Sequence, residues 1–202
     1  MANDWKTRPL HELILSSQVW GRSSVVPETV QFAKQLREDP QNQLLWHAHR
    51  RRLDFEQLRD TVLAVSGQLD LKMYGRPVSV TEPGNHRRTV YAFVERQNIP
   101  SIVRTFDFAN ADTSTGRRVN TTVPQQALFA MNSPFMRQAA ESLAEQVNGI
   151  EPPVQVEQLY QLTLGRTPDD EERQLALDYL NGGTTSQFAQ VLLMSNQLSF
   201  VD

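Results

Sequence analysis

The sequence predicts a mainly α fold: a multi-helix domain with a small β-hairpin and a C-terminal antiparallel helical bundle. Three observations lead to this prediction. Apolar residues recur at helical spacing along most of the chain, residues that favour helix starts precede these segments, and one short segment alternates with a period of two. The 202 residues, 39% hydrophobic and 21% charged, have the composition of a globular protein with a sizeable core.

Four short helices are expected in the first third of the chain. Their predicted ranges are 8–19, 28–37, 41–52 and 54–67. In the fourth, Asp54 and Gln57 have the spacing of a capping box, which satisfies backbone N–H groups at a helix start. Phe55, Leu58 and Val62 share one face of this helix, so we expect that face to be buried.

The middle of the chain is expected to hold the β-hairpin and a long loop. Residues 77–80 and 88–94 are the predicted strands, because the second is rich in β-branched and aromatic residues that alternate in period two. Residues 100–106 are expected to form one or two helical turns. Residues 107–121 are a polar loop of about fifteen residues, a length typical of functional or mobile loops in compact domains.

The last third carries the clearest helix signals. Thr122 and Gln125 are expected to form a capping box for a helix over 124–131, and Ser133 to start a helix over 135–147. Thr167, followed by Pro168 and acidic residues, predicts a further helix start. The remaining expected helices are 154–164, ended by Gly165, and 185–198. We therefore expect a single domain or a fragment of a larger domain, with helices, hairpin and loop in residues 1–132 and an acidic bundle in residues 133–202.

The charge balance differs between the two parts of the chain. The net charge is −3, but residues 1–118 carry 17 basic and 13 acidic side chains, whereas residues 119–202 carry 3 and 10. This distribution argues against a nucleic-acid partner, because the acidic part would repel phosphates. The absence of cysteine excludes disulfides and covalent haem attachment in this chain. No run of residues is long and apolar enough for a membrane span, and we find no signal peptide.

Arg52, Glu56 and Asp60 form the first candidate site. Steps of four residues place them on one face of a helix, if the helix is continuous from Arg52 onward. Such a face fits an anion or a carboxylate-bearing sugar. The alternative, which we favour, is an ion-paired seam between helices.

The second candidate site lies in the long loop. Asp107, Asp112, Arg117 and Arg118 precede the helix expected near Thr122, whose unpaired N–H groups favour negative charge and so fit an anion site. The alternative is a loop held to the helices by salt bridges. In that case, basic side chains of this region would pair with nearby carboxylates: Arg52, Arg88, Arg117 and Arg118 with Asp54, Glu56, Asp60, Asp107 and Asp112.

No standard catalytic or metal-binding motif is present. The chain contains no G-x-S-x-G, no phosphate-binding glycine loop and no H-E-x-x-H. His47 and His49 are two residues apart and would point to different sides of a helix, and the acidic residues lack the spacing of a calcium loop. We therefore predict no metal site.

An ordered series of short stretches resembles the C-terminal part of a family known from planctomycetes, the domain of unknown function 1553. The stretches are Leu10–Ile14, Ser16-Ser17, Ser23-Ser24, Leu44–Trp46, Arg51–Asp54, Arg59-Asp60, Val65–Gly67, Arg87–Tyr91, Phe106–Phe108, Arg117-Arg118, Thr121–Leu128, Asn132-Ser133, Leu159-Tyr160, Leu164–Pro168, Ser195-Asn196 and Phe200–Asp202. The resemblance covers nearly the whole chain from about Leu10.

The resemblance implies a place in a larger protein. Members of that family are typically exported, multidomain and associated with a cytochrome-c-like domain, so the chain would be a fragment whose partners are upstream domains of the same polypeptide. It would lie in the periplasm or another extracytoplasmic space, and haem would belong only to a separate upstream domain. The leading functional prediction is an uncharacterised helical module with a packing or interaction role. The alternative is an enzyme domain that acts on polysaccharide through an Asp/Glu/Arg cleft, with a small-molecule or polysaccharide ligand that remains to be identified.

Overall fold

The computed structural model is mainly helical and describes residues 6–26, 29–110, 112–116 and 118–201. The chain divides into two compact units: Met1–Arg51 with Phe200–Asp202, and Arg52–Ser199. Within the described residues it has ten α-helices and one small antiparallel sheet, formed by β1 (Arg51–Arg52) and β2 (Phe200–Val201). The predicted mainly helical fold class is therefore confirmed, although the small sheet joins residues 51–52 to 200–201. None of the helices among these residues is long and apolar enough to cross a membrane.

The first unit contains two short helices. They are α1 (Arg8–Leu15), which buries none of its residues, and α2 (Val30–Glu38), which begins where Thr29 Oγ1 accepts a hydrogen bond from Phe32 N–H. Both are shorter or shifted relative to the predicted ranges.

The helix predicted over 41–52 is wrong. The carboxylate of Asp39 accepts hydrogen bonds from the N–H groups of Gln43 (2.9 Å) and Leu44 (2.8 Å), which turns the chain instead. Asn42 and Leu45 both have positive φ, at 52° and 53°, a conformation that a right-handed helix excludes. The chain therefore runs through turns in this segment and then enters β1.

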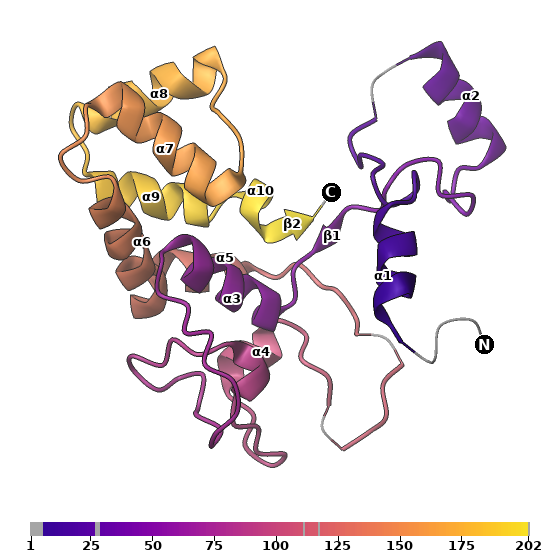
Figure 1. Cartoon of the computed structure of the whole chain (residues 1–202), viewed down its shortest axis with the longest axis horizontal. Helices are drawn as coiled ribbons and strands as arrows, with labels where there is room; N and C mark the ends of the chain where they lie inside the picture. The colour runs from indigo at the N-terminus through magenta and orange to yellow at the C-terminus, as the bar shows by residue number, and fades with distance from the viewer. Residues whose placement is uncertain (1–5, 27–28, 111, 117, 202) are drawn as a thin grey trace. The chain divides into compact units, whose positions relative to one another are not determined.

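The second unit is built around helices from two distant parts of the sequence (Figure 1). Its first helix is α3 (Phe55–Val65), and α4 (Ser101–Thr105), α5 (Pro124–Asn132) and α6 (Pro134–Gln146) follow. The remaining helices are α7 (Pro152–Leu164), α8 (Asp170–Leu180), α9 (Thr185–Leu193) and α10 (Asn196–Ser199). α9 packs against α6, α7 and α8, as expected of a bundle. The subdivision predicted at residue 132 lies inside this unit.

Two hydrophobic clusters hold the second unit together. The larger one joins Val62 of α3 to fully buried side chains of the bundle, among them Leu143, Leu159 and Leu193. The smaller one consists of Phe55, Val103 and Phe106, and so joins α3 to α4. α3 contributes to both clusters, which fixes the position of its polar face relative to the loops that cover it.

The predicted hairpin over 77–94 is not formed. Residues Thr89–Tyr91 form a short 3-10 helix, η1, and isolated parallel bridges link Val78 to Ala92 and Asp70 to Arg87. The reason lies in α3, whose Arg59 donates to the carbonyls of residues 85 and 87 and whose Asp60 accepts from the N–H of residue 89. In the predicted strand over 88–94, the N–H of Thr89 is thus paired with a side chain, and the carbonyls of Arg88 and Thr89 accept from the N–H groups of Tyr91 and Ala92 in the turn of η1.

Some helix starts and ends also differ from the predicted ones. The start at Ser133 is confirmed, since its Oγ accepts from Met136 N–H at 3.2 Å. In place of the capping box predicted for Thr122 and Gln125, the structure has a hydrogen bond one residue later, in which Gln126 Oε1 accepts from Val123 N–H. The last predicted helix is broken between α9 and α10, where Ser195 Oγ accepts from Leu198 N–H.

Candidate functional site

The candidate residues are organised by α3 and the segments that cover its polar face. The helix begins as predicted, with Gln57 Oε1 accepting from Asp54 N–H at 3.1 Å. Phe55, Val62 and Leu63 turn toward the interior, and this orientation leaves Glu56 and Asp60 half-buried beneath the loops.

Asp107 is the centre of a network that closes the long loop. Its Oδ2 accepts from Arg52 Nη2 at 3.0 Å and from Thr121 N–H at 2.8 Å, and its Oδ1 accepts from Thr121 Oγ1 at 2.6 Å. Arg52 Nη1 also donates to Thr121 O and to Gln126 Oε1, while Gln126 Nε2 donates to Thr105 O at 2.8 Å. The first and last residues of the predicted loop are therefore tied to each other and to Arg52, which lies in β1 shortly before α3.

The backbone at Asp107 has a left-handed conformation, with φ of 60°. Asp107 N–H donates to Arg104 O and Phe108 N–H to Val103 O, the two hydrogen bonds of a Schellman motif at the end of α4. Glycine is the usual residue at this position, and aspartate is one of the few others that adopt the conformation readily. The left-handed conformation alone would favour glycine, so we attribute the presence of aspartate at this position to the interactions of its carboxylate.

The environment lowers the pKa of Asp107. Burial alone would raise it, but the hydrogen bonds from Thr121 and the hydrogen bond and charge of Arg52 together outweigh burial. The ion pair itself is largely sheltered, with side-chain exposures of 9% for Arg52 and 17% for Asp107. A carboxylate with a lowered pKa and hydrogen bonds on both oxygens suits a structural role better than proton transfer.

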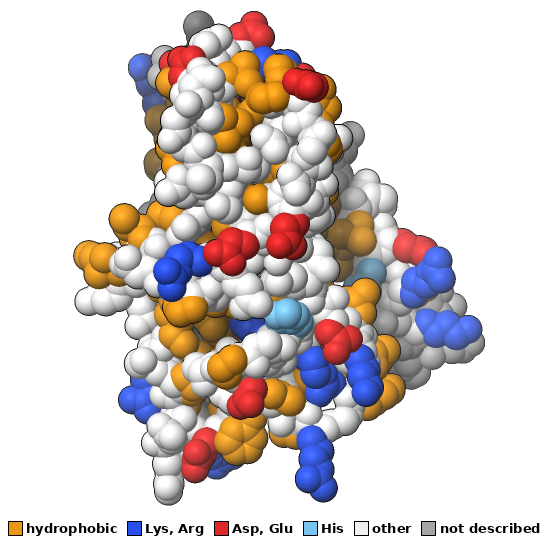
Figure 2. Space-filling model, turned by 90° about the vertical axis from the view of Figure 1, so that its left-hand side faces the viewer, with side chains coloured by type: hydrophobic (Ala, Val, Ile, Leu, Met, Phe, Trp, Pro, Cys, Tyr) orange, Lys and Arg blue, Asp and Glu red, His pale blue; other side chains and the backbone are white. Residues whose placement is uncertain are grey.

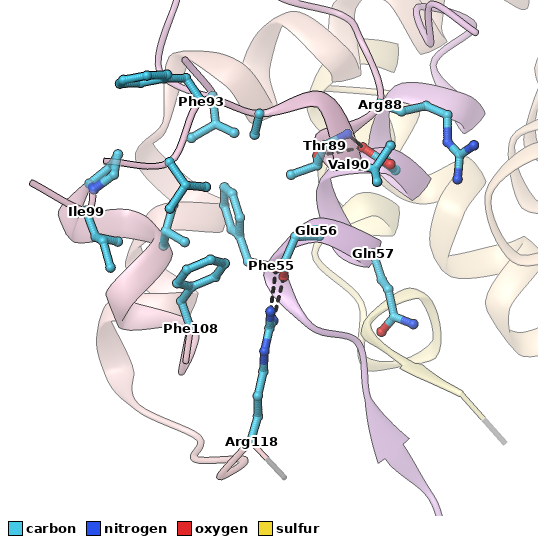
Figure 3. A pocket seen from close by; sticks show the side chains of 16 residues that line it. Phe55, Glu56, Gln57, Arg88, Thr89, Val90, Phe93, Ile99, Phe108 and Arg118 are labelled. Atoms are coloured by element: carbon cyan, nitrogen blue, oxygen red, sulfur yellow. Dashed lines mark hydrogen bonds and ion pairs between the residues drawn. The ribbon is translucent and has the colours of Figure 1, made fainter. Parts of the chain in front are cut away.

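Glu56 is bound by Arg118 from the far end of the long loop. Two parallel hydrogen bonds, of 2.9 and 2.8 Å, join the guanidinium to the two carboxylate oxygens, as Figure 3 shows. These bonds are the main reason that the pKa of Arg118 is raised. Arg118 also lies over the ring of Phe108, 4.8 Å from its centre, and 3.8 Å from Asp54. The pair holds the loop on the first turn of α3.

Asp60 and its neighbour Arg59 form hydrogen bonds to the segment around η1. Asp60 Oδ1 accepts from Thr89 N–H at 2.8 Å and from Thr89 Oγ1 at 2.6 Å, and it lies 3.7 Å from Arg59 Nη1. Arg59 is 3% exposed and donates to three oxygens, those of Asn85 O, Arg87 O and Thr89 Oγ1. Burial lowers the pKa of Arg59, and the charge of Asp60 offsets part of that effect.

Sequence reasoning missed Arg59, Thr89 and Gln126 as members of these networks. Arg59 was visible only as a charged residue opposite the apolar stripe of its helix. Its burial depends on a segment about thirty residues later in the chain, a long-range contact that local periodicity does not report.

Two of the described candidate residues do not join these networks. Among the described residues, Arg88 makes no ion pair and is exposed, which contradicts its predicted pairing with a carboxylate. Asp112 is exposed too, and its N–H donates to Asn110 Oδ1. Arg117 lies outside the described residues. The structure thus brings Arg52 to Asp107, and Arg118 to Glu56 and, at 3.8 Å, to Asp54, whereas Arg88 and Asp112 form no such pair with the residues it describes.

A pocket of 440 Å³ lies between α3, α4 and the segment around η1 (Figure 3). Its walls are mainly apolar, and its charged residues are Glu56, Asp60, Arg88 and Arg118. No group of three or more potential metal ligands occurs in the described parts of the chain. On the face shown in Figure 2, acidic, basic and hydrophobic side chains are interspersed.

Comparisons with known proteins identify one family. A family model described as "Protein of unknown function (DUF1553)" matches residues 1–180. Neither the curated proteins nor the solved structures gave a match.

Proposed function

The chain belongs to the DUF1553 family of proteins of unknown function, and on this premise we propose that it is a helical packing and interaction module without an active site of its own. The observation that carries this proposal is the state of the candidate carboxylates. Glu56 is bound on both oxygens by Arg118, Asp107 by Arg52 and Thr121, and Asp60 by Thr89. Side chains used in this way hold segments of the chain together.

The rival function is an enzyme domain that acts on polysaccharide. Glycoside hydrolysis requires two carboxyl groups that converge on an open cleft, one of which has a raised pKa so that it can act as an acid. The pocket beside α3 is lined by Glu56 and Asp60. However, among the described residues the carboxyl groups with a clearly shifted pKa are Asp107 and Glu172, and both pKa values are shifted downward, by hydrogen bonds from Thr121 and Arg52 in the first case and chiefly from Arg166 in the second. This pattern supports the structural role.

The proposed partners are upstream domains of the same polypeptide, in an extracytoplasmic protein whose haem is held by a separate domain. This part of the proposal rests on the family resemblance and on α1. The helix buries none of its residues, and Leu10, Leu13 and Leu15 are each more than half exposed. Apolar faces of this kind are typical of contact surfaces.

Thermal unfolding tests the structural role of the carboxylates. Glu56→Gln removes the charge that Arg118 binds, which we expect to cost about 2 kcal/mol and to lower Tm by about 5 °C. Asp112→Asn is the matched control, because Asp112 lies in the same loop without an ion pair to the described residues, and it should leave Tm unchanged within about 1 °C.

The same variants distinguish the rival function. Release of reducing ends from a panel of neutral and acidic polysaccharides would be measured with the unaltered chain. The proposal predicts no release. Release that is abolished by Glu56→Gln, at an unchanged Tm, would establish the enzyme instead.

A further inference from the structure

The pocket beside α3 has two chemically different ends. Figure 3 shows Phe93, Ile99 and Phe108 at one end, and Arg88 with Gln57 at the other. Phe55, which is 5% exposed, forms part of the apolar wall. The volume of 440 Å³ lies within the range of about 300–1,000 Å³ that is usual for small-molecule sites.

The charges that line the pocket are not equally available to a ligand. Glu56 and Arg118 neutralise each other through two hydrogen bonds, and Asp60 accepts two hydrogen bonds from Thr89. Arg88 makes neither an ion pair nor a side-chain hydrogen bond with the described residues. The amide NH2 of Gln57 likewise makes no hydrogen bond with them, since it is Oε1 that accepts from Asp54. One end of the pocket therefore offers a cation and a second donor.

We propose that this pocket binds a small organic anion with an aromatic or branched apolar body. The body lies among Phe93, Ile99 and Phe108, and the acidic group lies at Arg88 and Gln57. A guanidinium binds a carboxylate or sulfonate through paired N–H donors, which fixes the orientation of the ligand, while burial of the body supplies most of the affinity.

The neighbouring cavity of 320 Å³ is a poorer site for such a ligand. It shares Phe55 and Val80 with the first pocket and has Arg59 in its wall. The Nη donors of Arg59 are already engaged by Asn85 O, Arg87 O and Thr89 Oγ1. An anion bound to these Nη groups would compete with the bonds that hold the segment around η1, which leaves it only the buried Nε of Arg59, a donor without a partner among the described residues.

Two fluorescent probes with nearly the same aromatic skeleton test the proposal. 8-Anilinonaphthalene-1-sulfonate carries an anionic group, and N-phenyl-1-naphthylamine lacks it. Each would be titrated into the whole chain, and amide shifts in 1H–15N spectra would locate the binding. We expect both probes to shift the amides of Gln57, Thr89, Val90 and Phe93, and the sulfonate to bind about fivefold more tightly than the neutral probe.

Three variants separate the contributions of the charge and of the cavity. Arg88→Gln should abolish the fivefold preference and leave the affinity for the neutral probe unchanged. Arg96→Gln is the matched control, since Arg96 is an exposed arginine nearby that does not line the pocket, and it should change neither affinity. Val90→Trp places a large side chain at an exposed lining position and should prevent both probes from shifting these amides.

Several results would overturn the inference. Amide shifts confined to α1 or to the neighbouring cavity would show that this pocket is not the site. Equal affinity for the two probes, or a preference that persists in Arg88→Gln, would show that Arg88 does not recognise the anion. These results leave the proposed structural role of Glu56 untouched, because that role is tested by thermal unfolding.

Discussion

At the scale of single residues, Asp107 has two requirements to satisfy at once. Its backbone ends α4 in a left-handed conformation, and its carboxylate binds Arg52 and Thr121. Glycine would satisfy only the first requirement and glutamate only the second. Aspartate and asparagine adopt the left-handed region more readily than other side chains, so aspartate meets both.

A substitution series at Asp107 separates the two requirements. Asp107→Asn keeps the backbone preference but removes the charge, and we expect a loss of about 3 kcal/mol, because Arg52 is left largely buried without its partner. Asp107→Ala should cost about 1 kcal/mol more, since alanine adds left-handed strain. The loss for Asp107→Gly should be closer to the loss for Asp107→Asn than to the loss for Asp107→Ala. Urea unfolding measures all three, and equal losses for Gly and Ala would contradict the backbone argument.

The lowered pKa of Asp107 also predicts a pH dependence. A carboxyl group whose pKa is lower in the folded state contributes stability above its unfolded pKa of about 3.9, and this stability is lost as the pH falls through the folded pKa. The free energy of unfolding should therefore fall less steeply below about pH 4 in Asp107→Asn than in the unaltered chain. Urea titrations at a series of pH values measure the slopes, and identical slopes would mean that Asp107 is not shifted.

At the scale of secondary-structure elements, α8 shows which local signals could be predicted and which could not. Thr167 was predicted as the cap, but the helix begins two residues later, with Asp169 Oδ1 accepting from Glu172 N–H at 2.8 Å and Glu172 Oε2 accepting from Asp169 N–H at 3.0 Å. Arg166 donates to both oxygens of Glu172 and to Gln197 of α10. The contact with Gln197 supports the later start and is not visible in any local pattern, whereas the capping-box spacing of Asp169 and Glu172 is a local signal for the same start.

The corrected cap predicts the outcome of two alanine substitutions. Asp169→Ala should lower the free energy of unfolding by about 0.5–2 kcal/mol, because a backbone N–H loses its acceptor. Thr167→Ala should change it by less than about 0.5 kcal/mol, since its side chain does not cap the helix. The two values come from urea unfolding, and the reverse order would restore Thr167 as the cap. Millimolar calcium should leave Tm unchanged, because the acidic run serves the helix start rather than a cation.

The exposed face of α1 gives a second prediction at this scale. Leu13→Glu should leave the free energy of unfolding unchanged within about 0.5 kcal/mol, because Leu13 is 69% exposed. It should also reduce concentration-dependent self-association, measured by sedimentation velocity, because an apolar contact surface is lost. Leu63→Ala, at a fully buried position of α3, is the contrasting control and should cost about 2–5 kcal/mol. Destabilisation by Leu13→Glu would show that α1 is covered.

Helix positions were predictable where local signals sufficed. Ser133 before Pro134, and Gly165 with φ of 68° at the end of α7, mark boundaries through nearest-neighbour chemistry. The predictions for residues 41–52 and 77–94 were wrong because side chains from outside these segments bind their backbone groups. Asp39 redirects the first segment, and Arg59 holds the second across the surface of α3. Such contacts override local propensity.

At the scale of the whole molecule, charge pairs between distant segments supplement the hydrophobic clusters of the second unit. The sequence showed that both signs of charge gather near α3, and it favoured an ion-paired seam. It did not show which partners would meet, because Arg52 and Asp107 are 55 positions apart and are brought together by the packing of Phe55 against Phe106. The two phenylalanine rings, 5.6 Å apart, place the carboxylate within reach of the guanidinium.

The central claim is that this charge cluster holds the fold together, and a double-mutant cycle between Arg52 and Asp107 tests it most directly. Arg52→Gln, Asp107→Asn and the double variant would be compared with the unaltered chain by urea unfolding, with Arg52→Gln combined with Asp112→Asn as the control pair. The structure predicts a coupling energy of at least about 1.5 kcal/mol for Arg52 with Asp107, and additive effects within about 0.5 kcal/mol for the control. A coupling energy below about 0.5 kcal/mol between Arg52 and Asp107 would contradict the claim.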